Sequence, residues 1–334
     1  MSAIRLGTRA STLATTQSEM VARLLRSEGL DVDLTTITTH GDTSTASLAA
    51  MGGIGVFASA IRATLLKGEA DIAVHSFKDL PTGRPLGLAI GAVPARADPR
   101  DALVARDGLT LHDLPQEASV GTGSPRRAAQ LLAVRPDLTI VDIRGNVDTR
   151  LGRVKGLGRY AKNGGKEDLD AVVLAASGLA RLGHSGTVTE FLDPSVVLPA
   201  PAQGALAVEC RTADSRHGKL AKALARIDDR RTRLAATAER AVLSHLEAGC
   251  AAPIGALAQL KPVSGSSPQV LTLDVVVATV DGSRIIREQV SVELPAEVEP
   301  ALAAAHTLGV TAAEELLDDG AADVADLKAS GSTR

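Results

Sequence analysis

Apolar and polar positions along the chain follow two alternating patterns. Short runs such as "IRLGT" and "DIAVHS" have the character of strands, and longer stretches between them carry apolar residues at helical spacing. In residues 12–28, Leu13, Val21 and Leu25 recur on one face of a predicted helix that stops at Gly29. Strands that alternate with amphipathic helices predict an α/β protein.

Changes in this pattern predict more than one domain. Pro99 lies in the charged stretch "ARADPR", and "LPAPAQGALAVECR" passes from a Pro-rich run into a strand, which suggests two crossings between domains. Beyond residue 225 a long helix precedes a predicted hairpin and further helices. The expected division is a discontinuous N-terminal lobe of residues 1–94 and 205–224, a second lobe of residues 95–204, and a C-terminal domain of residues 225–334.

Composition narrows the class of protein. Of the 334 residues, 45% are apolar and only 1% are aromatic, so the predicted core is aliphatic. A formal net charge of −3 and few aromatic side chains disfavour a nucleic-acid partner, which needs a basic surface or stacking platforms. No apolar run approaches the roughly 18 residues of a membrane span, and the N-terminus has no apolar signal segment. We therefore expect a cytoplasmic protein with no membrane partner.

The clearest candidate site is "SVGTGSPRRAAQ", where a strand leads into a helix. Ser124 is expected at the N-cap and Pro125 at the first helical position. Arg126 and Arg127 then fall in the first turn, where the helix dipole disfavours each cation by ~0.3–1 kcal/mol. Free N–H groups and two guanidinium groups there predict an anion site, and replacing either arginine is expected to leave stability nearly unchanged. The alternative is a pair of solvated surface arginines.

Further arginines follow other predicted strands. Arg144 and Arg150 lie in "DIRGNVDTRLGR", and Arg9 and Ser11 follow the first strand in "LGTRAS". Several arginines at strand ends in a net-acidic chain predict an anion pocket at the carboxyl edges of the sheets. The expected partner is a small polyanion with carboxylates or phosphates. The chain has no GxxxxGK[ST] sequence, so a P-loop nucleotide site is not indicated.

The stretch "VHSFKDLPT" places Ser76, Lys78 and Asp79 directly after a predicted buried strand. Asp79 could simply cap the turn before the proline, which is a common use of aspartate. It could equally be a functional carboxylate that the arginines keep ionised and that bonds to N–H groups or to a developing cation. The residues alone do not separate these two hypotheses.

The chain has two cysteines, and their spacing, with no CxxC, disfavours a disulfide framework or a metal site. Cys210 alternates with Leu206 and Val208 in a predicted strand and is expected to be buried and inert. Cys250 follows Gly249 at the negative end of a predicted helix, which raises the pKa of a thiol and disfavours a turnover nucleophile. Cys250 is therefore either an ordinary loop cysteine or a thiol that reacts once to hold a covalent group.

Nine segments, spread in order along nearly the whole chain, match the motifs of one known family: "RLGTRAS", "THGD", "GGIGVF", "DIAVHSFKDLPT", "DPRDALVAR", "VGTGSPRRAAQL", "IRGNVDTRL", "LPAPAQGALAVECR" and "TAERAVLSHLEAGCAAPIGA". With these segments the chain resembles the porphobilinogen deaminase family, whose members are also called hydroxymethylbilane synthases. The resemblance implies two similar α/β lobes like those of type II periplasmic binding proteins, followed by a smaller C-terminal α/β domain. It also implies a dipyrromethane cofactor joined to Cys250 through a thioether. The implied reaction is the head-to-tail condensation of four porphobilinogen molecules, with release of ammonia, to linear hydroxymethylbilane.

The resemblance further implies a role for each candidate residue. Asp79 matches the family's catalytic aspartate, with Lys78 and Ser76 expected to orient it, and Phe57 matches a loop aromatic near the pyrroles. Gln203 lies in the matching hinge segment. The implied carboxylate-binding residues are Arg9, Ser11, Thr122, Ser124, Arg126, Arg127, Arg144 and Arg150, together with Gln203.

This chain departs from the family's pattern in three ways. Ile54 stands where the glycine loop commonly has a lysine, the helix that begins at Ala58 lacks a further lysine that the family often has, and Gly123 stands where a serine is usual. Arg62 is a candidate to compensate for the missing basic residues of the lid. We expect a monomeric enzyme that needs no metal or nucleotide. A non-enzymatic anion receptor on the same fold and a thiol-dependent transferase are the alternatives.

Overall fold

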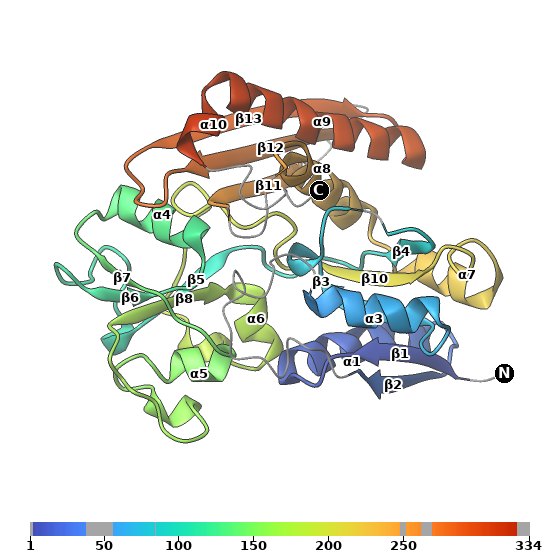
Figure 1. Ribbon diagram of the computed structural model, residues 1–334, viewed down its shortest axis with the longest axis horizontal. Coiled ribbons are helices and arrows are strands. Elements are labelled where there is room, and N and C mark those ends of the chain that lie inside the picture. The colour runs from blue at the N-terminus through green and yellow to red at the C-terminus, as the bar shows by residue number, and fades with distance from the viewer. Residues whose placement is uncertain (1–2, 38–55, 84, 248–251, 262–268, 326–334) are drawn as a thin grey trace.

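The computed structural model describes residues 3–37, 56–83, 85–247, 252–261 and 269–325. It contains three β-sheets with helices packed against them, and the C-terminal sheet and its helices lie across the two lobes (Figure 1). The prediction of an α/β protein with two similar lobes and a C-terminal domain is confirmed.

The first lobe contains a five-stranded sheet in the order β2-β1-β3-β10-β4, in which β10 runs antiparallel between β3 and β4. Helix α1 buries Val21 and Leu25 against Leu6 and Ile72 of the sheet, which is the face that the sequence pattern predicts. The elements of this lobe are β1 (Ile4–Thr8), α1 (Thr12–Ser27), β2 (Val32–Thr36), α3 (Val56–Leu66), β3 (Ile72–Ser76), β4 (Leu88–Ala92), β10 (Leu206–Arg211) and α7 (Gly218–Ile227).

The second lobe repeats this arrangement with a sheet in the order β7-β6-β8-β5-β9. In each lobe three parallel strands are followed by an antiparallel fourth strand that enters directly from a crossing, β10 in the first lobe and β5 in the second. The elements here are β5 (Asp101–Ala105), β6 (Ser119–Gly121), α4 (Pro125–Val134), β7 (Thr139–Val141), α5 (Val147–Leu151), β8 (Ala171–Ala175), α6 (Ala176–Arg181) and β9 (Glu190–Phe191).

The C-terminal domain has a three-stranded antiparallel sheet whose packed face is covered by α8 and α9. The predicted hairpin is present between β12 and β13, with Gly282 in the left-handed region of backbone space. At Gly309 of α9 an added Cβ would lie 2.2 Å from the Ala238 carbonyl oxygen, so the two helices touch through their backbones. The elements are α8 (Arg230–His245), β11 (Ile254–Leu260), β12 (Gln269–Ala278), β13 (Ile285–Leu294), α9 (Val298–Asp318) and α10 (Ala321–Val324).

The two crossing segments between the lobes are tied to each other and to α8. Arg96 of the first crossing donates two hydrogen bonds to the buried Glu239 carboxylate of α8, at 2.6 and 3.0 Å, and a third to the Gln203 carbonyl of the second crossing. Glu239 also accepts from the Ala202 amide. At Gly204 an added Cβ would meet the Ala97 carbonyl oxygen at 2.6 Å. The C-terminal domain is thus joined to the point where the lobes meet.

The core is aliphatic, as the composition predicts, and its clusters consist mainly of Ala, Val, Leu and Ile. Cys210 is buried in β10, and burial raises the pKa of its thiol to about 11. This agrees with the prediction of an inert strand cysteine. None of the helices in the described ranges combines the length and apolar character that a bilayer crossing requires.

Candidate functional site

The junction of β6 and α4 has the geometry that the sequence predicts. Ser124 is the N-cap residue of α4 and Pro125 its first helical residue. The Ser124 amide donates to the Thr122 hydroxyl at 3.2 Å, while the Ser124 side chain makes no capping hydrogen bond. An added Cβ at Gly123 would lie 2.6 Å from the Ile143 carbonyl oxygen, so the serine usual in the family would require this backbone to move.

Arg126 and Arg127 are buried, with side chains only 4% and 7% exposed, and both are paired with Asp101 at the start of β5. Arg126 Nη2 lies 2.8 Å from Asp101 Oδ2, and Arg127 donates through Nε and Nη2 to Asp101 Oδ1 at 2.9 and 2.7 Å. Arg126 also donates to the Leu198 carbonyl, and Arg127 to the Val173 carbonyl. Burial alone would raise the pKa of Asp101, but the two guanidinium groups outweigh it and hold this pKa well below the usual range.

These contacts bear on two sequence-based expectations. The surface alternative for Arg126 and Arg127 is wrong, and the buried ion pairs argue against the expectation that replacing these arginines leaves stability unchanged. The unfavourable helix dipole is offset by a carboxylate from another strand, and breaking a buried pair of this kind costs about 3–5 kcal/mol. Since Asp101 carries one negative charge and the two arginines carry two positive charges, the cluster keeps a net positive charge.

Gln203 connects this cluster to the first lobe. Its buried amide donates from Nε2 to Asp101 Oδ1 at 2.8 Å and to the Pro99 carbonyl at 2.7 Å. Its Oε1 accepts from Lys78 Nζ at 3.2 Å. Burial lowers the pKa of Lys78 to about 8, although the neighbouring Asp79 opposes that shift. Lys78 of the first lobe therefore lies against the anion-binding cluster of the second.

Asp79 ends a short 3-10 turn (Phe77–Asp79) that follows β3 directly. Its side chain is exposed, and within the described ranges its carboxylate accepts no hydrogen bond, so a capping role for Asp79 finds no support there. The Ser76 hydroxyl instead accepts from the Gln17 amide of α1 at 3.0 Å. An exposed carboxylate beside Lys78 can face a cationic or N–H-bearing ligand.

The remaining predicted residues surround this centre. Burial lowers the pKa of Arg150, and the nearby Arg127 lowers it further; Arg150 Nε donates to the Gly145 carbonyl at 2.9 Å. Arg144 is more exposed and lies 3.5 Å from Asp142. Ser11 accepts from the Ala14 amide at 3.4 Å, which makes it the N-cap residue of α1, with Arg9 two positions before it.

Arg181, at the end of α6, is a candidate that the sequence analysis missed. Its Nη2 donates to the Gly204 carbonyl at 2.7 Å, but among the described residues its buried Nε has no hydrogen-bond partner. Burial lowers the pKa of Arg181 to about 10, and no carboxylate contributes to that shift. An arginine in the last turn of a helix is favourable for the dipole, so its position gave no sequence signal. Its unpaired N–H group near the crossing fits an anionic ligand.

Four residues singled out in the sequence concern the lid and the attachment cysteine. Cys250 and Ile54 lie outside the described residues, and of Phe57 only the backbone is described, as the second residue of α3. The suggested compensation by Arg62 stays a prediction, and the contacts of Arg62 do not favour it. Its guanidinium is committed to the buried Glu209 of β10, with Nε donating to both carboxylate oxygens at 3.0 and 3.1 Å.

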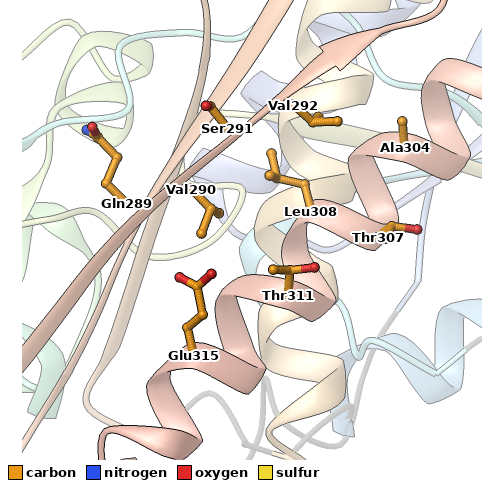
Figure 2. A pocket seen from close by; sticks show the side chains of 9 residues that line it. All are labelled: Gln289, Val290, Ser291, Val292, Ala304, Thr307, Leu308, Thr311 and Glu315. Atoms are coloured by element: carbon orange, nitrogen blue, oxygen red, sulfur yellow. The ribbon is translucent and has the colours of Figure 1, made fainter.

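Two other kinds of site receive no support. Across the described ranges, no group of three or more His, Cys, Asp or Glu side chains could hold a metal ion. A hollow of about 550 Å³ lies between β13 and α9, away from the arginine cluster (Figure 2). Its described lining consists of apolar and hydroxyl side chains with Gln289 and Glu315, and includes no arginine or lysine. This hollow is therefore unsuited to a polyanion.

Comparison with known proteins gives a consistent result. Residues 4–219 match the family model described as "Porphobilinogen deaminase, dipyromethane cofactor binding domain", and residues 233–318 match "Porphobilinogen deaminase, C-terminal domain". The chain is 97% identical over 334 residues to a porphobilinogen deaminase of Cutibacterium acnes, with all of both chains covered. It is 52% identical to a porphobilinogen deaminase from Micrococcus luteus, and this match covers 96% of this chain and 94% of the relative. Among solved structures, apo YehZ from Escherichia coli is 13% identical with a TM-score of 0.40, covering 68% of this chain and 86% of that one, and we rest no argument on it.

Proposed function

The chain belongs to the porphobilinogen deaminase family, and from this premise we propose that it condenses four porphobilinogen molecules head to tail. Each step releases ammonia, and the product is linear hydroxymethylbilane, which makes the protein a transferase. The observation that best supports this reaction is the site itself. A positively charged cluster beside an exposed carboxylate suits a substrate that carries carboxylates and passes through a cation.

The dipyrromethane cofactor of the family fits the residues present. Its pyrroles carry acetate and propionate groups, and the unpaired Nε of Arg181 beside the crossing offers a donor for such a group. When bound, the cofactor supplies the pyrrole onto which the new chain is built. We propose that Cys250 holds it through a thioether, which is the second of the two hypotheses for this cysteine, a single permanent reaction.

The arginines divide into two groups by their contacts. Arg150, Arg144, Arg181 and Arg9 are proposed to bind substrate carboxylates, with the hydroxyls of Ser11, Thr122 and Ser124 as further donors. Arg126 and Arg127 share their charge between Asp101 and the substrate, because most of their N–H groups already point to protein oxygens. Gln203 keeps Lys78 and Asp101 in one network.

Asp79 is proposed to act on the pyrrole ring. Loss of ammonia from porphobilinogen leaves a cation, and coupling produces a second cationic ring before a proton is lost. A fixed carboxylate at the ring N–H stabilises both cations more than the neutral substrate. Removal of this carboxylate should therefore lower mainly kcat. Since no protein group in the described ranges bonds to it, the Asp79 carboxylate is available for this task.

The proposed attachment is tested by the intact mass of the purified protein. We expect a mass above that of the sequence by one dipyrromethane, absent from Cys250→Ser and retained in Cys210→Ser. The buried Cys210 is a matched control, since its thiol is hidden in β10. Full activity in a protein whose Cys250 carries no adduct would overturn the proposal.

An anion receptor on the same fold is the rival, and Asp79→Asn separates the two. If the protein is the enzyme, this variant keeps size and turn geometry while turnover falls by about 10²-fold or more. A receptor would bind porphobilinogen in both forms and release no ammonia from either. We also propose that the protein is monomeric and cytoplasmic; sedimentation equilibrium at micromolar concentration checks the first point and cell fractionation the second.

A further inference from the structure

Arg240 of α8 reaches out of the C-terminal domain onto the turn that carries Asp79. Its Nη1 donates to the carbonyls of Phe77 at 2.9 Å and Leu80 at 2.7 Å, and its Nη2 donates to the Pro81 carbonyl at 2.7 Å. Its guanidinium carbon also lies 4.4 Å from the centroid of the Phe77 ring. The three carbonyls flank Asp79 on both sides, so one guanidinium group holds the backbone around the carboxylate.

The turn depends on such an outside contact. It is a 3-10 turn of three residues, closed by a bond of 3.3 Å from the Leu80 amide to the Phe77 carbonyl. Turns of this length have poor hydrogen-bond geometry and little stability of their own. The Asp79 carboxylate forms no bond within the described ranges that would fix it. Its position is therefore set by the backbone, and Arg240 provides three of the bonds to that backbone.

Helix α8 also leads toward the attachment cysteine. It ends at His245, five residues before Cys250 in the sequence. One helix thus carries both the guanidinium that holds the Asp79 turn and the segment that continues to the cofactor's anchor. The same helix carries Glu239, which holds both crossing segments through Arg96 and Ala202. Arg240 thus joins the turn of the first lobe to the domain whose sequence contains Cys250.

We propose that Arg240 is a positioning residue that sets the Asp79 carboxylate relative to the covalently held pyrroles. The inference rests on the proposed function, because it takes Asp79 as the group that acts on the substrate. It goes beyond packing between domains, because the contact is made to the backbone of the turn itself. A displacement of about 1 Å at a reacting group can cost ~10²-fold in rate.

Arg233 provides a matched control. It lies on the same helix and is also half-buried, but its Nε donates to Asp228 at 2.7 Å, and its weak contact to the first lobe is with the Ile90 carbonyl in β4. Arg233→Gln therefore loosens an inter-domain contact of α8 without touching the turn.

The experiment compares Arg240→Gln, Arg240→Lys and Arg233→Gln by kcat, KM, cofactor content from intact mass, and hydrogen exchange. For Arg240→Gln we expect kcat per cofactor-loaded molecule to fall at least tenfold, with KM within about twofold. Exchange should accelerate in the peptide that covers residues 77–82. Arg240→Lys should recover part of the kcat and part of the exchange protection of this peptide, since an ammonium group still donates to carbonyls. Arg233→Gln should leave kcat and the exchange of this peptide unchanged.

A double-mutant cycle tests whether Arg240 acts through Asp79. In the Asp79→Asn background, Arg240→Gln should lower kcat by less than threefold, because the carboxylate that it positions is already gone. Equal fold-losses in both backgrounds would overturn the inference, as would normal kcat and normal exchange in Arg240→Gln. If Arg240→Gln does not fold, the same cycle is carried out with Arg240→Lys in its place, and the same two outcomes support or overturn the inference. Absence of turnover in the wild-type protein would refute the proposed function. The hydrogen-exchange comparison would still show whether Arg240 holds the turn.

Discussion

At the scale of single residues, Asp101 determines what the arginines of α4 can do. Two guanidinium groups share its carboxylate in a buried site, and Gln203 adds a further hydrogen bond. Charged groups removed from water are stable only when paired and hydrogen-bonded, so this cluster is preformed rather than assembled by the ligand. In the proposed reaction, the substrate would therefore meet donors that are already oriented.

Arg126→Gln is therefore expected to lower the free energy of unfolding by on the order of 3 kcal/mol at neutral pH. The loss follows from leaving Asp101 with one cationic partner in a buried place. Urea unfolding followed by circular dichroism measures it. Arg144→Gln is the control: it lies in an exposed pair with Asp142 and should shift stability by less than about 0.5 kcal/mol. Equal stability of the two variants would show that the buried pair contributes nothing.

Lys78 predicts a pH dependence of activity. Its folded-state pKa is about 8, so its positive charge is lost from the free protein as pH rises through that value. If that charge helps to hold substrate carboxylates, kcat/KM falls above about pH 8. Lys78→Arg keeps the charge at all these pH values and should move the fall to higher pH. A profile that is unchanged in Lys78→Arg would assign the alkaline limb to another group.

The lowered pKa of Lys78 also predicts how the stability of the protein depends on pH. The unfolded chain holds the Lys78 proton up to the ordinary value of 10.5, whereas the folded protein releases it near 8. Between these values the unfolded state binds more protons, so Lys78 makes folding more favourable as pH rises. Relative to Lys78→Met, the wild-type protein should therefore gain stability from pH 8 to pH 10. A constant difference between the two would contradict the lowered pKa.

At the scale of elements, how much the sequence predicts depends on how far apart the interacting residues lie. The N-cap at Ser124, the helical face of Val21 and Leu25 and the hairpin before β13 depend on neighbours in the sequence, and all three were predicted. The partner of Arg126 was not, because Asp101 lies in another strand and nothing local marks it. Arg181 was missed for the opposite reason, since its local context satisfies the ordinary rule for a helix end.

Helices α8 and α9 provide a test of close packing. Replacing glycine by alanine inside a helix normally stabilises it by ~1 kcal/mol. At Gly309 the new methyl group would lie 2.2 Å from the Ala238 carbonyl oxygen and 2.7 Å from the Ala241 side chain. Gly309→Ala should therefore destabilise the protein by about 1–3 kcal/mol, seen as a lower Tm. Gly178→Ala in α6, where the added group would meet nothing within 4 Å beyond its chain neighbours and the helix's own backbone, should be neutral or stabilising.

At the scale of the whole molecule, the three units meet at one place. The crossings, α8 and the turn of Asp79 are joined through Arg96, Glu239, Gln203 and Arg240. The sequence analysis expected two crossings, but the side chains that join them come from segments more than a hundred positions apart. Their pairing is a property of the assembled fold, and no periodicity along the chain reports it.

The interior place of β10 has a consequence for the order in which the protein forms during translation. Leu206 of β10 pairs with Ser76 of β3, and Arg211 of β10 pairs with Leu88 of β4. Until β10 has left the ribosome, β3 and β4 therefore lack the strand that lies between them in the native sheet. All five strands of the second lobe lie between Asp101 and Phe191 and emerge earlier. A fragment of residues 1–200 that has been released from the ribosome should therefore resist protease in the second lobe and be cut in the first. The lobe that is synthesised first is the later of the two to reach its native structure.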